Sequence, residues 1–354
     1  MATSQYKNIL VSRLFKNISV FVIILLLVSS TYARRSAEGP VRLTIYPAKA
    51  GETEKKYKLL VNTEDQTEGD AVQLYDQAIK SIPKDFNQEQ IDDLLKLHVE
   101  QLPKQQVEEM LQKYLEPLKL VVRATRCKEC NWPELKPKSQ LGDLGGFRKL
   151  AFILRLWARL EISQDGYEGA IIAMRTGFVM AKDLGQAPTI IQGLVGISVG
   201  AVMCKELEQY VQGQDSPNLY RVMVDMPRPF VDIEKAIEHE KKVHLDLPPD
   251  DIRQGQTAEQ KETQFDRLRS ISKRLDNNLN GLQCVEAIRH YAATHAGQLP
   301  QVLGDIKDLK IPNDVMSGKT FEYSRTSTGA VLKSVMPEGG RPKDMIHYEI
   351  VLKK

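Results

Sequence analysis

A candidate catalytic serine lies in the string GISVG at 196–200. This string matches the G-x-S-x-G pattern of serine hydrolases, in which the serine sits on a sharp turn between a buried strand and a helix. Ser198 lies instead inside one apolar run with helical spacing, and no alternation of strands and helices surrounds it. We therefore expect Ser198 to be structural. Gly196 and Gly200 share one helical face, where a neighbouring helix can approach closely.

Two pairs of histidines resemble zinc ligands. His239 and Glu240 begin HEKKVH, which is one residue longer than the zinc-protease pattern H-E-x-x-H. Histidines four residues apart stand on one helical face, whereas His239 and His244 point about 140° apart. His290 and His295 have the same unsuitable spacing. We expect exposed helix histidines and no metal site.

The chain contains four cysteines. Cys127 and Cys130 form C-x-x-C, a spacing used by redox dithiols, by half of a zinc site and by local disulfides. A thioredoxin-like pair opens a helix after a strand, whereas this pair follows a predicted helix and precedes Asn-Trp-Pro at 131–133. We expect a structural disulfide or two partly buried thiols. Cys204 and Cys284 lie in apolar helical stretches and are predicted to be core residues.

The sequence identifies no catalytic or cofactor-binding residue. It contains no phosphate-binding loop, dinucleotide fingerprint or EF-hand loop. Acidic residues are plentiful but scattered along predicted helices, so a carboxylate pair for glycoside hydrolysis has no assignable position. We therefore expect no cofactor.

The first 33 residues have the layout of a signal peptide. Basic residues without acidic ones precede the apolar run ISVFVIILLLV at 18–28, and Thr31 and Ala33 suit cleavage after Ala33. The alternative is an uncleaved membrane anchor, with Tyr32, Arg34 and Arg35 at the interface. Either form places the protein in the periplasm or cell envelope.

The mature chain is formally neutral, because residues 1–33 hold three of the 49 basic residues and none of the 46 acidic ones. Nucleic acids and anionic membranes are bound largely through clustered positive charge. We therefore expect no nucleic-acid partner, and membrane contact only through an uncleaved N-terminal segment.

Hydrophobic periodicity predicts a mainly α fold with a small α+β module at the C-terminal end. The predicted divisions are 1–33 (signal peptide or anchor), 34–126 (a short β-hairpin of 41–48 with 57–61, then helices), 127–146 (a Cys-, Pro- and Gly-containing loop), 147–256 (a helical domain) and 257–354 (a long helix and the α+β module).

The helical regions contain a hairpin, an uncharged stretch and a charge-rich stretch. The helices at 147–163 and 168–184 are joined by QDGY, an order like that of one tetratricopeptide hairpin. No charge occurs from 184 to 204, which indicates either a buried helix, our preferred interpretation, or a second membrane span. The charge-rich stretch up to 280 predicts a solvated or surface-lying helix.

The C-terminal module should pack one helix on a three-stranded antiparallel sheet. Spacings of four and three place Cys284, Ile288 and Tyr291 on one helical face. The strands at 321–324, 330–335 and 346–352 alternate apolar and polar residues. Their predicted inward residues are Phe321, Tyr323, Val331 or Leu332, Ile346, Tyr348, Ile350 and Leu352.

Over roughly residues 41–352 the chain resembles a group of exported planctomycete proteins that have no assigned activity. The motifs that carry this resemblance are LVNTEDQTEGDAVQLY, CNW at 130–132, RLWARLEISQDGYEGAIIAMRTGF, TIIQGLVGIS and SPNLYRVMVDMPRPF. The resemblance implies a shared architecture and no mechanism.

The C-terminal module is similar to the periplasmic part of type II secretion major pseudopilins, through VEAIRHYAATHAGQLPQVL at 285–303 and PNDVMSGKTFEY at 312–323. This resemblance implies that Gly297 caps the helix and that Leu299 and Pro300 turn the chain toward the sheet. The N-terminus lacks the pattern processed by prepilin peptidase, so no fibre assembly is implied.

Two functions fit the sequence. The first is a non-enzymatic envelope or periplasmic protein whose helical hairpins and α+β module present surfaces to a protein partner. The alternative is an exported hydrolase or lyase with a site built from scattered carboxylates and histidines. A pocket that gathers several titratable groups with shifted pKa would favour the enzyme.

Overall fold

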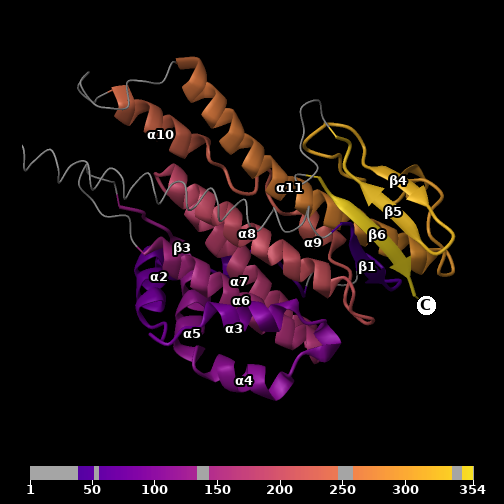
Figure 1. The fold of residues 1–354 in the computed structure, drawn as a ribbon, viewed down its shortest axis with the longest axis horizontal. Coiled ribbons are helices and arrows are strands. Elements are labelled where there is room, and N and C mark those ends of the chain that lie inside the picture. The colour runs from indigo at the N-terminus through magenta and orange to yellow at the C-terminus, as the bar shows by residue number, and fades with distance from the viewer. Residues whose placement is uncertain (1–38, 52–55, 134–142, 246–257, 337–344, 354) are drawn as a thin grey trace, which may run out of the picture.

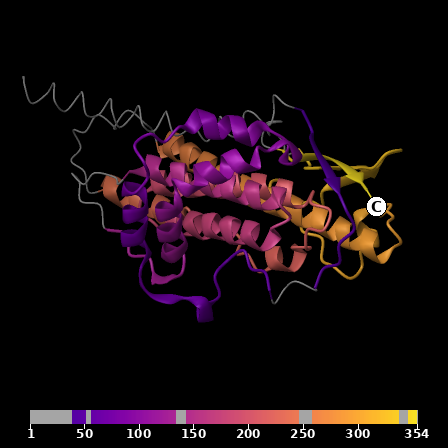
Figure 2. The same ribbon diagram turned by 90° about the horizontal axis from the view of Figure 1, so that it is seen from below.

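The computed structural model describes residues 39–51, 56–133, 143–245, 258–336 and 345–353. Within them the protein is mainly helical, with a small sheet at one end of the helical body (Figure 1 and Figure 2). The signal peptide or anchor predicted at residues 1–33 and part of the loop predicted at 127–146 lie outside the described residues.

The main helices and the three C-terminal strands follow the order expected from the sequence. The helices are α2 (Ala71–Lys80), α3 (Gln88–Lys96), α4 (Lys104–Gln112), α5 (Leu115–Ala124), α6 (Leu144–Ser163), α7 (Tyr167–Gly185), α8 (Ile190–Tyr210), α9 (Tyr220–Val224), α10 (Glu234–Leu245) and α11 (Ala258–Thr294). Short 3-10 turns are η1 (Thr63–Asp65), η2 (Val99–Gln101) and η4 (Leu303–Asp305). The strands are β1 (Val41–Ile45), β2 (Thr67–Asp70), β3 (Cys127–Glu129), β4 (Glu322–Arg325), β5 (Ala330–Lys333) and β6 (His347–Leu352). The short strands β2 and β3 were not predicted, and β3 lies within the predicted loop.

Helix α8 lies at the centre of the fold, where α6, α7 and α11 pack around it. Its length and composition would suit a membrane span, but 83% of its apolar window is buried inside the protein. This burial agrees with the preferred prediction of a buried core helix. Helices α6 and α7 form the predicted hairpin, and Asp165 adopts a φ of 56° in its turn. Its likeness to a tetratricopeptide hairpin stays a prediction.

The glycines of α8 allow close helix packing, but against more than one neighbour. A Cβ at Gly196 would lie 2.6 Å from the carbonyl oxygen of Ala181 in α7. A Cβ at Gly200 would lie 2.8 Å from a methyl group of Leu275 in α11. The predicted close approach is confirmed, but two helices, α7 and α11, approach the glycines where one was expected.

Helices α2 to α5 cover α6 on one side of the core (Figure 1). Their ends follow from the local sequence, since the side chains of Asp70 and Asn87 accept backbone N–H groups at the starts of α2 and α3. Pro103 stands immediately before α4, where a helix does not need its N–H. Apolar side chains at helical spacing, such as Tyr75 and Ala78 in α2, then face the core.

The prediction of a solvated or surface-lying helix up to residue 280 is correct only for the first part of α11. Arg269 there forms exposed ion pairs with Glu234, Glu262 and Asp266. From Ile271 onward the helix is largely enclosed, and its polar side chains are buried because they bond other segments. The Asp276 carboxylate, for example, accepts the Phe230 N–H at 2.8 Å.

The predicted N-terminal β-hairpin of 41–48 with 57–61 is wrong. Strand β1 pairs in parallel with β6, with Leu43 opposite Ile350, and no strand forms in the described residues of 57–61. The sheet order is β1-β6-β5-β4, so a strand from the N-terminal region completes a C-terminal sheet (Figure 1). The physical reason is burial, because Leu43 and Ile45 are both fully buried there.

The predicted C-terminal module is present, with β4, β5 and β6 antiparallel. Cys284 and Ile288 are fully buried, whereas Tyr291 is only partly buried. Among the predicted strand residues, Leu332 rather than Val331 is fully buried, Phe321, Ile346, Tyr348 and Ile350 are buried, and Tyr323 and Leu352 are partly buried.

The C-terminal end of α11 has the expected glycine cap. The Gly297 N–H donates to the Ala292 carbonyl at 2.8 Å, which is the six-residue bond of a Schellman motif. Ala296, with a φ of 53°, takes the first left-handed position, and Gly297 follows with a φ of 71°. Leu299 and Pro300 are buried directly after the turn.

Candidate functional site

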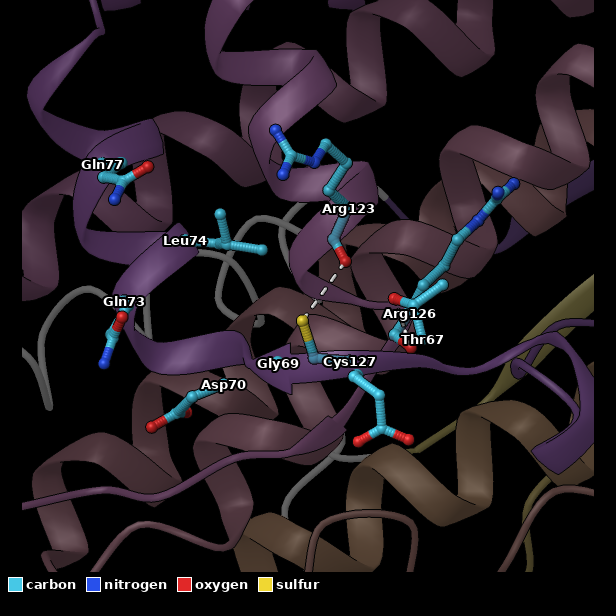
Figure 3. A pocket seen from close by; sticks show the side chains of 10 residues that line it. Thr67, Gly69, Asp70, Gln73, Leu74, Gln77, Arg123, Arg126 and Cys127 are labelled. Atoms are coloured by element: carbon cyan, nitrogen blue, oxygen red, sulfur yellow. Dashed lines mark hydrogen bonds between the residues drawn. The ribbon is translucent and has the colours of Figure 1, made fainter.

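The C-x-x-C motif lies beside a pocket at one corner of the helical body. Strand β3, which begins at Cys127, pairs in parallel with β2, and the end of β2 leads directly into α2. The pocket holds about 470 Å³ and lies between these strands, α2 and the end of α5 (Figure 3). Its lining residues are Thr67, Glu68, Gly69, Asp70, Gln73, Leu74, Gln77, Arg123, Arg126 and Cys127.

The Cys127 side chain is held in the floor of this pocket by the backbone around it. Its thiol donates a weak hydrogen bond to the Arg123 carbonyl oxygen at 3.6 Å (Figure 3). Gly69 has a φ of 136° and would bring a Cβ to 3.3 Å from the Cys127 sulfur. A side chain at position 69 would therefore strain the backbone and crowd the thiol.

The turn that carries Cys130 is fastened at two points. The Asp70 Oδ1 atom accepts the Val72 N–H at 3.0 Å and the Asn131 N–H at 3.1 Å, so one carboxylate caps α2 and holds the turn. The Trp132 indole N–H donates to the Asp183 carbonyl oxygen at 2.8 Å. The bonds of Asn131 and Trp132 therefore hold the chain directly after Cys130 against α2 and α7.

A buried carboxyl group lies beneath this turn. The Tyr75 hydroxyl donates to Asp183 Oδ2 at 2.6 Å, which joins α2 to α7. Burial raises the pKa of Asp183 to about 6, although the hydrogen bond from Tyr75 acts in the opposite direction. Burial also raises the pKa of Tyr75 well above its usual value.

These surroundings keep both thiols protonated. Burial raises the pKa of Cys127 and of Cys130, and the nearby Asp70 and Asp183 raise both further. A thiolate is the nucleophile in cysteine chemistry, so neither residue is activated for attack. Both are free, partly buried thiols in the structure, and their pairing as a disulfide stays a prediction. Cys204 and Cys284 are buried core residues, as predicted.

The histidine prediction is wrong for His290, which is buried rather than exposed. Its Nδ1 atom accepts the Ala50 N–H at 2.9 Å, so the proton of the neutral ring is on Nε2, which donates to Asp308. Both ring nitrogens are therefore occupied. His295 is exposed and stacks on Tyr291, with 3.7 Å between ring centroids.

The other candidate groups remain apart. Ser198 lies within α8, as expected, and His239 lies in α10. His244 is also in α10, but its side chain lies outside the described residues. Within the described ranges no three histidine, cysteine, aspartate or glutamate side chains come together in a way that could hold a metal ion.

The sequence interpretation missed two buried ion-pair groups. Glu206 in α8 accepts from Arg155 Nε at 2.7 Å and from Arg159 Nε at 2.9 Å, both in α6. Burial alone would raise the pKa of Glu206, but the two arginines outweigh it and lower the pKa. Glu286 accepts from Arg289 at 3.0 Å, and both side chains are fully buried. Charged residues inside otherwise apolar helical faces are the sequence feature from which these buried ion pairs could have been predicted.

Comparisons of the chain with protein-family models, curated proteins and solved structures found no match.

Proposed function

We propose that this protein is a non-enzymatic, exported protein of the periplasm or cell envelope that binds a protein partner. One observation carries the proposal: the buried carboxylates Asp183, Glu206 and Asp276 each accept a hydrogen bond from another element of the fold instead of facing a shared pocket. Glu206 ties α8 to α6, and Asp276 ties α11 to the segment before α10. Such groups hold elements of the fold together, so we infer that partner binding takes place at the surface.

The alternative, a hydrolase or lyase, would require several titratable groups with shifted pKa in one pocket. The pocket beside the C-x-x-C motif contains one lining residue of that kind, Cys127. Its pKa is raised, which is the wrong direction for a nucleophile at neutral pH. The position of Ser198 inside α8 likewise gives no strand-to-helix turn for a serine nucleophile.

A cross-linking experiment in intact cells tests the proposal. A tagged full-length chain is expressed in its native host, treated with an amine-reactive cross-linker and purified from the envelope fraction. We expect one dominant cross-linked protein, absent when an unrelated helical protein with the same N-terminal segment is used.

N-terminal sequencing should show a mature chain that begins near Arg34 or an envelope-bound chain that retains Met1. A cytoplasmic chain without a cross-linked partner would refute the proposal.

A further inference from the structure

Three arginine residues lie near one another at the corner that contains the C-x-x-C pocket. Arg123 and Arg126 both line this pocket, from the end of α5 and the residues just after it. Arg175 projects from α7 close enough to Arg126 for their charges to repel each other. We call Arg123, Arg126 and Arg175 the arginine ridge. The ridge is a local excess of positive charge on a chain whose mature charge is balanced.

The acidic side chains around the ridge are already engaged. Glu68 forms a salt bridge with Lys128. Asp70 accepts two backbone N–H groups, and Asp65 accepts the side-chain amide of Asn62 at 3.2 Å. No described residue forms a salt bridge or side-chain hydrogen bond with any of the three guanidinium groups. Among the described residues, the donors of the ridge therefore have no side-chain acceptors.

Arg175 differs from the other two arginines of the ridge, because it is half-buried whereas Arg123 and Arg126 are exposed. Burial lowers the pKa of Arg175, and the like charge of Arg126 lowers it further, with only partial compensation from Asp65. An enclosed cation beside a second cation is unfavourable unless an anion joins them. Arg123 and Arg126 line an open pocket and no described carboxylate bonds either of them, so an acidic group from another molecule fits this corner.

The shape of the ridge favours an extended ligand over a single ion. Arg123 reaches over Leu74 toward Gln77, whereas Arg126 extends to the opposite side (Figure 3). One small anion cannot bridge guanidinium groups that diverge in this way. Successive residues of an extended chain are about 3.3 Å apart, so carboxylates along one segment can reach both ends of the ridge. The exposed amides of Gln73 and Gln77 can bond its backbone.

We propose that the arginine ridge binds an acidic segment of the partner protein. This inference rests on the proposed function and specifies the chemistry of the partner. The pocket favours a peptide over a nucleic acid, because its lining includes an apolar Leu74 but no aromatic ring on which a base could stack. Arginine forms two parallel hydrogen bonds with a carboxylate, which suits glutamate and aspartate side chains.

Fluorescence anisotropy with the full-length protein tests the inference. The probe is a labelled hexaglutamate peptide with blocked ends, titrated at low ionic strength, and hexaglutamine is the neutral reference. We expect binding of hexaglutamate only, weakened tenfold or more by Arg126→Gln or by Arg175→Gln. Arg267→Gln, at an exposed arginine of α11, is the matched control and should leave the affinity unchanged.

Three results of the titration would overturn the inference. They are a wild-type protein that does not bind hexaglutamate, a control variant that loses as much affinity as the ridge variants, and a preference for a hexathymidylate oligonucleotide over the peptide. Misfolding is excluded by thermal unfolding, in which Arg126→Gln should be at least as stable as wild type because a like-charge repulsion is removed. If cross-linking to the partner persists unchanged in Arg126→Gln and Arg175→Gln, the ridge is wrong while the proposed function stands.

Discussion

Tyr75 and Asp183 are joined by a buried hydrogen bond of 2.6 Å beneath the turn that carries Cys130. The bond links α2 to α7, and the backbone carbonyl of Asp183 holds the indole of Trp132 above it. One residue of α7 thus fixes both the helix that follows β2 and the C-x-x-C turn. This arrangement explains how a short loop keeps a defined shape at the corner of the helical body.

The ionisation of Asp183 should make stability depend on pH. Its pKa is raised from 3.8 to about 6 in the folded protein, so the folded state holds the proton more tightly than the unfolded state. The contribution is full below about pH 4 and is lost as pH rises through 6, by roughly 3 kcal/mol at most.

Asp183→Asn should therefore be more stable than wild type at pH 8, because the amide oxygen still accepts the Tyr75 hydroxyl and carries no charge. Urea unfolding at pH 5 and pH 8 measures the effect, with the exposed Asp93→Asn as the control. Asp276, whose pKa is also about 6, should leave part of the pH dependence in both proteins. Equal stabilities of wild type and Asp183→Asn at pH 8 would show that Asp183 is not desolvated.

Loss of the Glu206 charge should strongly destabilise the folded protein. Glu206→Gln removes the charge that neutralises Arg155 and Arg159, and Arg159 is only 2% exposed. Removal of one partner from a buried pair leaves an uncompensated charge, so we expect a loss of roughly 3–5 kcal/mol in the free energy of unfolding. Glu109→Gln, on the exposed face of α4, is the control and should change little. Chemical denaturation of both variants decides whether the three charges act together.

The contact between α8 and α7 leaves no room for a side chain at Gly196. Gly196→Ala places a methyl group 2.6 Å from the Ala181 carbonyl oxygen, so the helices must separate. We expect a loss of about 1–3 kcal/mol in the free energy of unfolding. Gly304→Ala is a matched control, because the new methyl group would lie 3.9 Å from its nearest neighbour, the Val302 side chain. Comparable stability of the two variants would contradict the packing of α8 described above.

The inner face of the sheet should depend on Ile350. This residue is 1% exposed and lies between Leu43 of β1 and Ala330 of β5 in the register. Ile350→Ala should lower the free energy of unfolding by roughly 2–5 kcal/mol, because it leaves a cavity. Val351→Ala, next in the strand on the opposite face, should lower it less. A larger effect at Val351 would mean that β6 faces the other way.

Local patterns predicted the individual elements well. The spacing of apolar residues identified α11 and the three antiparallel strands, and Gly297 marked the end of α11. The partner of β1 could not be predicted, because alternation in VRLTI shows that one face is buried but not which strand lies alongside. Sequence proximity favours pairing with 57–61, whereas the actual partner, β6, is about 300 residues away.

The buried polar groups were also beyond local pattern. His290 was expected to be exposed because its spacing to His295 excluded a shared metal ion, and that argument says nothing about Ala50 or Asp308. The arginine ridge similarly combines residues from α5 and α7 that no short motif connects. Charged residues within apolar runs, such as Arg175 in AIIAMRTGF, are the feature of the sequence that indicates buried or half-buried charges.

The most direct test of partner binding is the mass of the native particle. The chain is released from its envelope fraction without denaturant and measured by native mass spectrometry, first at low salt and then at high salt. We predict a complex of defined stoichiometry with a second protein at low salt, which dissociates as salt screens the charges of the arginine ridge. Free chain of about 40.1 kDa, or of the smaller mature mass, at both salt concentrations would contradict the account.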